Sequence, residues 1–237
     1  MKHPMSIIDA ALRSGAPEAL QEALPLLAEM PLDANPLLAG CQGRVLHLLG
    51  RDAEARHYLE KAGAGREIGA LTLLGQLWLF GLGGEPDRAK ARDSLHRAAF
   101  LLNEAELTGL RLPDPNDNEP LRAAFDQLQK GDWEQTRRLL LPSAAAGHAG
   151  AQWNLGQIHQ QLNGPTDRQQ MFLWWALAGW AGDEDAQVNL AQLCWDGDGA
   201  APDRVLARRW AELAAAQGDE DGRTMLARMD AWQARHD

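Results

Sequence analysis

The chain repeats itself along its length, and this repetition constrains its fold more than any other feature. Residues 147–158 (GHAGAQWNLGQI) align with residues 182–193 (GDEDAQVNLAQL), so that Gly, Ala-Gln, Asn, Leu and Gln recur at an offset of 35. A third copy starts at Gly218, 36 positions after Gly182. Periods of roughly 20–50 residues are typical of solenoids, in which each repeat is one supersecondary unit that stacks on the next. We therefore expect a linear stack of similar units.

Each repeat has the pattern of two helices. Ala151, Leu155 and Ile158 recur at spacings of four and three residues, which predicts the buried stripe of an amphipathic helix. Asp167 and Asp203 stand where an N-cap would begin the second helix of a repeat. Alternating apolar and polar runs are missing, so the sequence predicts an all-α fold of at least ten helices without a sheet. The side chains expected to be buried between helices are Ala151, Leu155, Trp174, Ala186, Leu190 and Trp210.

The N-terminal part holds a further copy of the repeat and is separated from the rest by a proline-rich segment. Residues 81–88 (GLGGEPDR) align with 197–204 (GDGAAPDR), and both are expected to be turns between helices. Residues 110–120 (LRLPDPNDNEP) contain three prolines and cannot be helical throughout. We expect an N-terminal helical block at 1–110, a loop at 111–120 and a C-terminal repeat block at 121–237.

The pattern A-Q-x-x-L-G, G-x-G with P-D, A-x-x-W and A-A-x-x-G resembles the SEL-one-like repeat, a relative of the tetratricopeptide repeat. The resemblance covers about residues 64–105 and 130–230, and the segments that carry it are Ala151–Gly156, Gly197–Asp203, Ala207–Trp210 and Ala214–Gly218. It implies an α/α superhelix, a solenoid whose first helices line a concave face that holds other proteins. It implies no catalytic residues, because the family has none in common.

Charge excludes several classes of partner. The 237 residues include 23 Lys and Arg against 33 Asp and Glu, a net charge of −10. Proteins that bind nucleic acid or an anionic membrane normally carry the opposite sign, so we expect neither partner. A partner protein with a basic surface would be attracted to this chain.

The chain also has the pattern of a cytoplasmic protein. Its longest apolar run, residues 171–182, is 12 residues long, whereas about 20 are needed to cross a bilayer. No apolar stretch of secretory length precedes Asp9, so we expect no signal peptide. Cys41 and Cys194 form no CxxC pair or zinc spacing, as expected in a reducing compartment.

Signals for catalysis are weak, and we predict that the protein is not an enzyme. None of the four serines lies in a G-x-S-x-G elbow. His148 and His159 would be about 16 Å apart on one helix, too far to share a metal ion. We expect no metal and no cofactor, with His159 and Cys194 packed in the core instead.

A row of polar residues marks the predicted protein-binding groove. Gln76, Gln157 and Gln192 occupy one position of the first helix in three copies, with Arg228 in the fourth, and Asn154 and Asn189 are likewise equivalent. An amide both donates and accepts hydrogen bonds, so such a row could hold an extended peptide backbone. Surface helix positions also simply favour Gln, and that alternative stays open.

One aromatic residue stands beside this row. Trp153 does not repeat and falls, with Gln157 and Gln160, opposite the core stripe of its helix. Exposed tryptophan in a groove is a favoured hot-spot residue, but contact with a neighbouring repeat would also explain Trp153.

Two functions follow from these patterns. The first is a non-catalytic scaffold or adaptor that binds a protein segment in its concave groove, for instance to neutralise or chaperone one dedicated partner such as a toxin or secreted effector. The alternative is an enzyme or small-ligand receptor that uses the N-terminal block, which the sequence supports less because it shows no set of nucleophile, base and orienting group.

Overall fold

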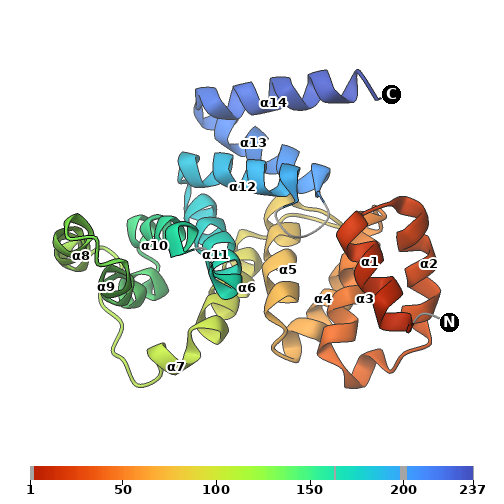
Figure 1. Ribbon diagram of the computed structural model, residues 1–237, viewed down its shortest axis with the longest axis horizontal. Helices are drawn as coiled ribbons and strands as arrows, with labels where there is room; N and C mark the ends of the chain where they lie inside the picture. The colour runs from red at the N-terminus through yellow and green to blue at the C-terminus, as the bar shows by residue number, and fades with distance from the viewer. Residues whose placement is uncertain (1–2, 163, 198–201, 237) are drawn as a thin grey trace. The chain divides into compact units, whose positions relative to one another are not determined.

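The computed structural model describes residues 3–162, 164–197 and 202–236, and in these residues it contains helices and no strand (Figure 1). The all-α prediction is therefore confirmed, as is the expected minimum of ten helices. One short 3-10 helix, η1 (Leu32–Ala34), accompanies the α-helices. The α-helices are α1 (Pro4–Ser14), α2 (Pro17–Ala28), α3 (Pro36–Leu48), α4 (Asp52–Ala64), α5 (Ile68–Phe80), α6 (Arg88–Leu102), α7 (Glu104–Leu107), α8 (Glu119–Gln129), α9 (Trp133–Ala146), α10 (Ala149–Leu162), α11 (Pro165–Ala181), α12 (Glu184–Asp196), α13 (Arg204–Gln217) and α14 (Glu220–Gln233).

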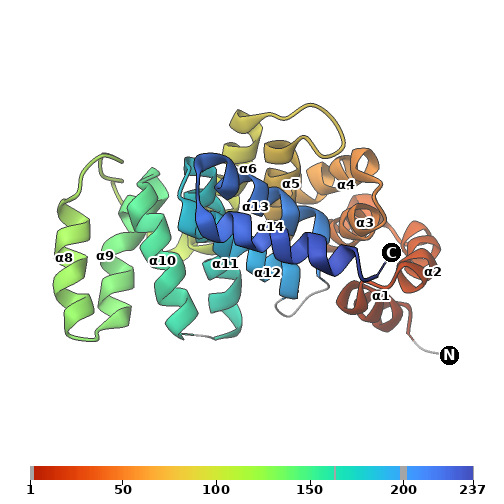
Figure 2. The same ribbon diagram turned by 90° about the horizontal axis from the view of Figure 1, so that it is seen from above.

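The chain forms two compact units. Unit 1 comprises residues 1–98 and 191–209, and unit 2 comprises residues 99–190 and 210–237. In unit 1, each of the helices α1 to α4 packs on the next one along the chain. In unit 2, α8, α9, α10 and α11 form one row of successive neighbours (Figure 2). This pairing of consecutive helices is the arrangement expected of a solenoid.

The expected core residues are buried. Ala151, Leu155, Trp174, Ala186, Leu190 and Trp210 each have no solvent-exposed surface. Gly156 shows how closely α10 and α11 pack, because a Cβ atom at this position would lie 2.2 Å from the indole ring of Trp175. Only glycine leaves room for that ring. In unit 1, a separate cluster that includes Ile8, Leu20 and Val45 forms the core under α1, α2 and α3.

The glycine that recurs in each repeat ends a helix. Gly147, Gly182 and Gly218 have φ values of 104°, 107° and 103°. Residues with a side chain rarely adopt this left-handed conformation, which lets the backbone turn out of a helix and begin the next one. The repeat therefore keeps glycine where the chain reverses direction.

Aspartates begin the helices, with one departure from the prediction. Asp203 caps α13 as expected, since its Oδ1 accepts from the backbone N–H of Leu206 at 3.0 Å. The N-cap prediction for Asp167 is wrong, because Pro165 starts α11 two residues earlier. Proline favours the first turn of a helix, so Asp167 lies inside it and accepts from the N–H of Gly164 at 2.9 Å. Of the predicted turn at 197–203, residues 198–201 lie outside the described residues.

The proline-rich segment is not helical as far as residue 118. Helix α7 ends at Leu107 and α8 begins at Glu119, in agreement with the predicted break. The whole segment lies within unit 2, whose boundaries fall elsewhere in the chain. The division of the chain into blocks 1–110 and 121–237 stays a prediction.

Candidate functional site

Four of the predicted groove residues lie on α10 of unit 2. Trp153, Gln157 and Gln160 are spaced by four and three residues and therefore share one face of the helix, next to Asn154. Gln160 is exposed and the other three are half-buried. The side-chain N–H of Asn154 donates to the Gly150 carbonyl at 2.7 Å, so this amide is partly used within its own helix. The remaining face is polar and partly accessible.

Trp153 stacks on a buried tryptophan of the same helix pair. Its ring centroid lies 5.8 Å from that of Trp175 on α11, with an angle of 28° between the rings. Trp175 is 1% exposed, so it forms a fixed support for the half-buried ring of Trp153. This stacking lies within one helix pair, and the role of Trp153 in a binding groove stays a prediction. Trp153 presents part of its surface on α10 while the stacking holds its orientation.

The other predicted groove residues fall on several helices of both units. Asn189 on α12 is half-buried and Arg228 on α14 is exposed, and both belong to unit 2. The Arg228 guanidinium lies 3.8 Å from the sulfur of Met225. Gln192 belongs to unit 1 and donates to the Asp196 carboxylate at 2.6 Å.

Gln76 requires a correction. It is 3% exposed and donates to the Thr72 carbonyl of its own helix at 3.3 Å. Helix α5 (IGALTLLGQLWLF) is apolar on nearly every side, and a helix of that kind is buried. Gln76 therefore does not offer its amide to a groove, although it shares a repeat position with Gln157 and Gln192.

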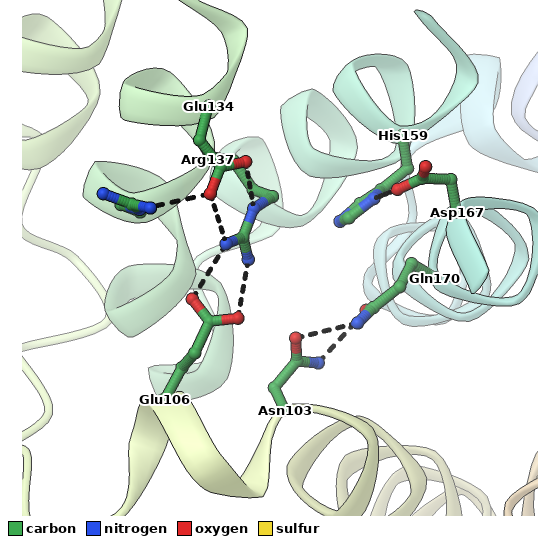
Figure 3. A network of polar contacts seen from close by, with 8 residues as sticks. Asn103, Glu106, Glu134, Arg137, His159, Asp167 and Gln170 are labelled. Carbon is green, nitrogen blue, oxygen red and sulfur yellow. Dashed lines mark hydrogen bonds and ion pairs between the residues drawn. The ribbon is translucent and has the colours of Figure 1, made fainter. Parts of the chain in front are cut away.

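A buried amide pair lies in unit 2 and was not predicted from the sequence. Asn103 and Gln170 exchange two hydrogen bonds of 3.1 and 2.9 Å (Figure 3). They are 3% and 9% exposed. Asn103 also donates to the Ala99 carbonyl at 2.9 Å. Because buried polar groups are costly unless they are hydrogen-bonded, this reciprocal pair ties the end of α6 to α11 in a specific register.

An arginine lies next to this pair and joins two glutamates (Figure 3). The Arg137 guanidinium on α9 makes two bonds of 3.0 and 2.9 Å to Glu106 on α7 and two of 3.1 and 3.0 Å to Glu134. The hydrogen bond to Glu134 is the largest influence and, with those to Glu106, outweighs desolvation and raises the pKa of Arg137. Such two-pronged pairs fix geometry as well as charge, so Arg137 holds α7 against α9.

His159 lies beside these groups and has the core role that the sequence predicts. It is 4% exposed, and its Nδ1 lies 2.7 Å from Oδ1 of Asp167 (Figure 3). Desolvation lowers the pKa of His159 and outweighs the hydrogen bond to Asp167, which raises it. The ring is therefore neutral near pH 7 and links the end of α10 to the start of α11.

A second histidine cluster lies in unit 1 and was also not predicted from the sequence. His47 near the end of α3 contacts Asp52 at the start of α4 through Nδ1, at 2.5 Å, and Asp203 through Nε2, at 2.8 Å. Desolvation opposes the charged ring, but the hydrogen bonds and charges of Asp203 and Asp52 outweigh it and raise the pKa of His47 to about 9. The one available sequence signal was Asp203, which aligns with the histidine-bound Asp167.

These clusters have the properties of structural supports. No hydroxyl or thiol of a described Ser, Thr or Cys is hydrogen-bonded to a histidine ring, the pairing that activates a nucleophile. Burial raises the pKa of the Cys194 thiol, which packs in the core as predicted. Among the described residues, no three His, Cys, Asp or Glu side chains are placed to share a metal ion.

In the part of the chain that the structure describes, no helix combines the length and the apolar character needed to span a membrane.

Comparison with known proteins identifies the repeat. The family model of the Sel1 repeat matches residues 51–65, 68–99, 149–179 and 184–219. A Sel1 repeat protein from Oxalobacter formigenes is 23% identical, with 86% of this chain and 81% of that chain covered and a TM-score of 0.40. A protective antigen of uropathogenic Escherichia coli with an SLR fold is also 23% identical, with 90% of this chain but 52% of the antigen covered and a TM-score of 0.37. No curated protein matches the chain.

Proposed function

The chain belongs to the Sel1-repeat family, and from this premise we propose that it is a non-catalytic scaffold that holds a segment of another protein. Sel1 repeats generally serve as protein–protein interaction modules. We assign the binding surface to α10, a first helix of a repeat in unit 2. We refer to Trp153, Asn154, Gln157 and Gln160 as the α10 face.

The observation that carries this proposal is the stacking of Trp153 on buried Trp175, 5.8 Å between ring centroids. A tryptophan with a fixed orientation loses little conformational entropy when a partner covers it, and tryptophan is enriched among residues that dominate binding energy. Gln157 and Gln160 lie on the same side of α10 and offer both donors and acceptors to a peptide backbone. The hydrogen bond between His159 and Asp167 ties the end of α10 to the start of α11 and so supports this helix.

We further propose that the scaffold is cytoplasmic and serves one dedicated partner with a basic surface, such as a toxin or secreted effector that it neutralises or chaperones. The net charge of −10 supports a basic partner, because complementary charge speeds association and disfavours wrong partners. Both cysteines are free thiols, as is usual in a reducing compartment.

The alternative of a small-ligand receptor in the N-terminal block has less support. Two cavities of unit 1 measure about 150 and 280 Å³. Pockets for drug-sized ligands and cofactors are usually about 300–1,000 Å³. Spaces of this size suit single side chains of a bound protein better than a cofactor.

The proposal is tested by isolating the partner and then weakening the α10 face. The whole chain serves as bait in native lysate, and a protein that is retained in stoichiometric amount is identified and purified. We expect Trp153→Ala and Gln157→Ala together to weaken its binding by about 30-fold, which corresponds to the usual hot-spot threshold of ~2 kcal/mol. Titration calorimetry on the purified pair measures the change.

Matched controls make the result specific. Gln161→Ala changes an exposed amide next to the α10 face, and Trp133→Ala removes a tryptophan that is 38% exposed on α9 of the same unit. Both should leave binding nearly unchanged, and circular dichroism should show that every variant is folded. The proposal would be contradicted if the affinity of the partner did not change in the α10-face variant, or if a small ligand bound in place of a protein.

A further inference from the structure

Unit 1 contains an open pocket between α3 and α5, which are the first helices of two successive helix pairs. Its volume is about 150 Å³, and its walls are mainly aliphatic, with Leu12, Leu59 and Leu73 among them. Leu37 forms part of the rim and is 56% exposed, which is unusual for so large an apolar side chain. Gly40 leaves space between α3 and Glu67 in one wall of the pocket, because a Cβ atom at this position would lie 3.0 Å from the Glu67 carboxylate. The pocket therefore offers an apolar surface to an aliphatic group of limited size.

One cationic side chain lines this pocket. Arg44 on α3 is half-buried, and in the described part of the chain no hydrogen bond or ion pair engages its guanidinium. Burial raises the pKa of the Asp203 carboxyl, but its contacts with His47 and Leu206 and, least of all, the charge of Arg44 lower it. The hydrogen bonds of this carboxylate go to His47 and Leu206 and not to Arg44. Arg44 thus keeps its donors available for an anion that enters the pocket.

The other polar groups of the lining are already occupied or neutral. The Glu67 carboxylate accepts the N–H of Gly69 at 3.1 Å and also that of Ala70, so it caps α5. Burial, together with the charges of Asp9 and Glu67, raises the pKa of the Cys41 thiol and keeps it neutral. A neutral thiol behaves as a small apolar group. Arg44 is therefore the lining residue whose charge and hydrogen-bond donors can select a ligand.

Resting on the scaffold function proposed above, we propose that this pocket binds the carboxyl-terminal residue of the partner protein, with its aliphatic side chain among the leucines and its terminal carboxylate on Arg44. The combination of an aliphatic lining with one guanidinium group decides between the possible anions. An internal Asp or Glu brings a carboxylate without aliphatic bulk, and an internal Leu brings bulk without charge. The last residue of a chain carries both within one residue.

The charge around the pocket further restricts which partner sequences can bind. The Glu67 carboxylate is part of the lining, so a segment with several acidic residues would be repelled there. A segment with one terminal carboxylate and basic residues before it suits both Arg44 and the net charge of −10.

The experiment uses the full chain and a pair of synthetic peptides. Acetyl-Gly-Ser-Lys-Ser-Leu is prepared as the free acid and as the C-terminal amide, and each is titrated while binding is followed by calorimetry and amide NMR shifts. We expect the free acid to bind at least about tenfold more tightly, because the amide removes the charge that Arg44 recognises.

Variants locate the effect. Arg44→Gln should abolish the preference for the acid, and Leu37→Ala should weaken both peptides, since its side chain is exposed and not part of the packed core. Arg122→Gln and Leu110→Ala are matched controls in unit 2, with Arg122 77% and Leu110 51% exposed, and should change neither result.

Equal affinity of acid and amide, no binding of either peptide, or an acid preference that survives in Arg44→Gln would each overturn the inference. The scaffold function is tested separately, because it depends on the α10 face in unit 2. If the peptides fail while the α10 variants still lose the native partner, the pocket assignment alone is wrong.

Discussion

His47 in unit 1 and His159 in unit 2 occupy similar places in their helix pairs but differ in charge. Each lies in the last turn of a first helix, is about 4% exposed, and contacts an aspartate in the first turn of the second helix. His159 has one carboxylate partner, and desolvation keeps its pKa below the usual value. His47 has a second partner in Asp203, and its pKa rises to about 9. One ring is therefore neutral near pH 7 and the other is charged.

The difference shows how much one additional carboxylate changes a buried site. Burial disfavours a charged ring at both positions, and a single aspartate does not overcome this cost at His159. The second aspartate reverses the balance at His47 and turns a helix-end contact into a bridge between residues 156 positions apart. The local pattern of histidine followed by aspartate is thus shared, while the protonation state depends on tertiary structure.

The largest expected effect is the loss of stability in His47→Leu. The substitution leaves Asp52 and Asp203 facing an apolar side chain, and breaking a buried ion pair by removing one partner costs about 3–5 kcal/mol. His159→Leu removes one neutral hydrogen bond and should cost only about 1 kcal/mol, because Asp167 still accepts from Gly164. Guanidinium unfolding of both variants measures the two losses. Equal losses would mean that His47 is not charged in the folded protein.

The sequence predicted the repeats better than the contacts between distant residues. The helices, the core positions of Trp174 and Trp210 and the cap at Asp203 follow from local periodicity, which each repeat carries within itself. Gln76 shows the limit of that reasoning, because its repeat position was right and its exposure depended on the apolar residues around it in α5. The bond between His47 and Asp203 lies beyond any local pattern.

Stability should also respond to pH in opposite directions at the two histidines. The pKa of His47 is raised from 6.5 to about 9, so its contribution is complete below pH 6.5 and is lost as pH rises through 9. A shift of that size is worth on the order of 3 kcal/mol. The pKa of His159 is lowered, so its contribution is present above pH 6.5 and is lost as pH falls below that value.

Unfolding curves across pH separate these two effects by difference. His47→Gln should flatten the loss of stability between pH 6.5 and 9 relative to the unmodified chain, and His159→Gln should flatten the loss below pH 6.5. The predicted difference between the two histidines would be wrong if both variants changed the loss of stability in the same pH range.

The smallest expected effect concerns Arg137, whose positive charge contributes to the lowered pKa of His159. Arg137→Gln removes this charge and should move the pKa of His159 upward, toward the behaviour of His47, without adding a second carboxylate. Arg138→Gln is the matched control, because Arg138 pairs with the same Glu134 at 3.1 Å but is not among the groups that shift His159. NMR titration of the ring protons measures the shift in each variant. An unchanged pKa in Arg137→Gln would leave desolvation by α10 and α11 as the sole reason that His159 is neutral, and an equal shift in both variants would trace the effect to Glu134 instead.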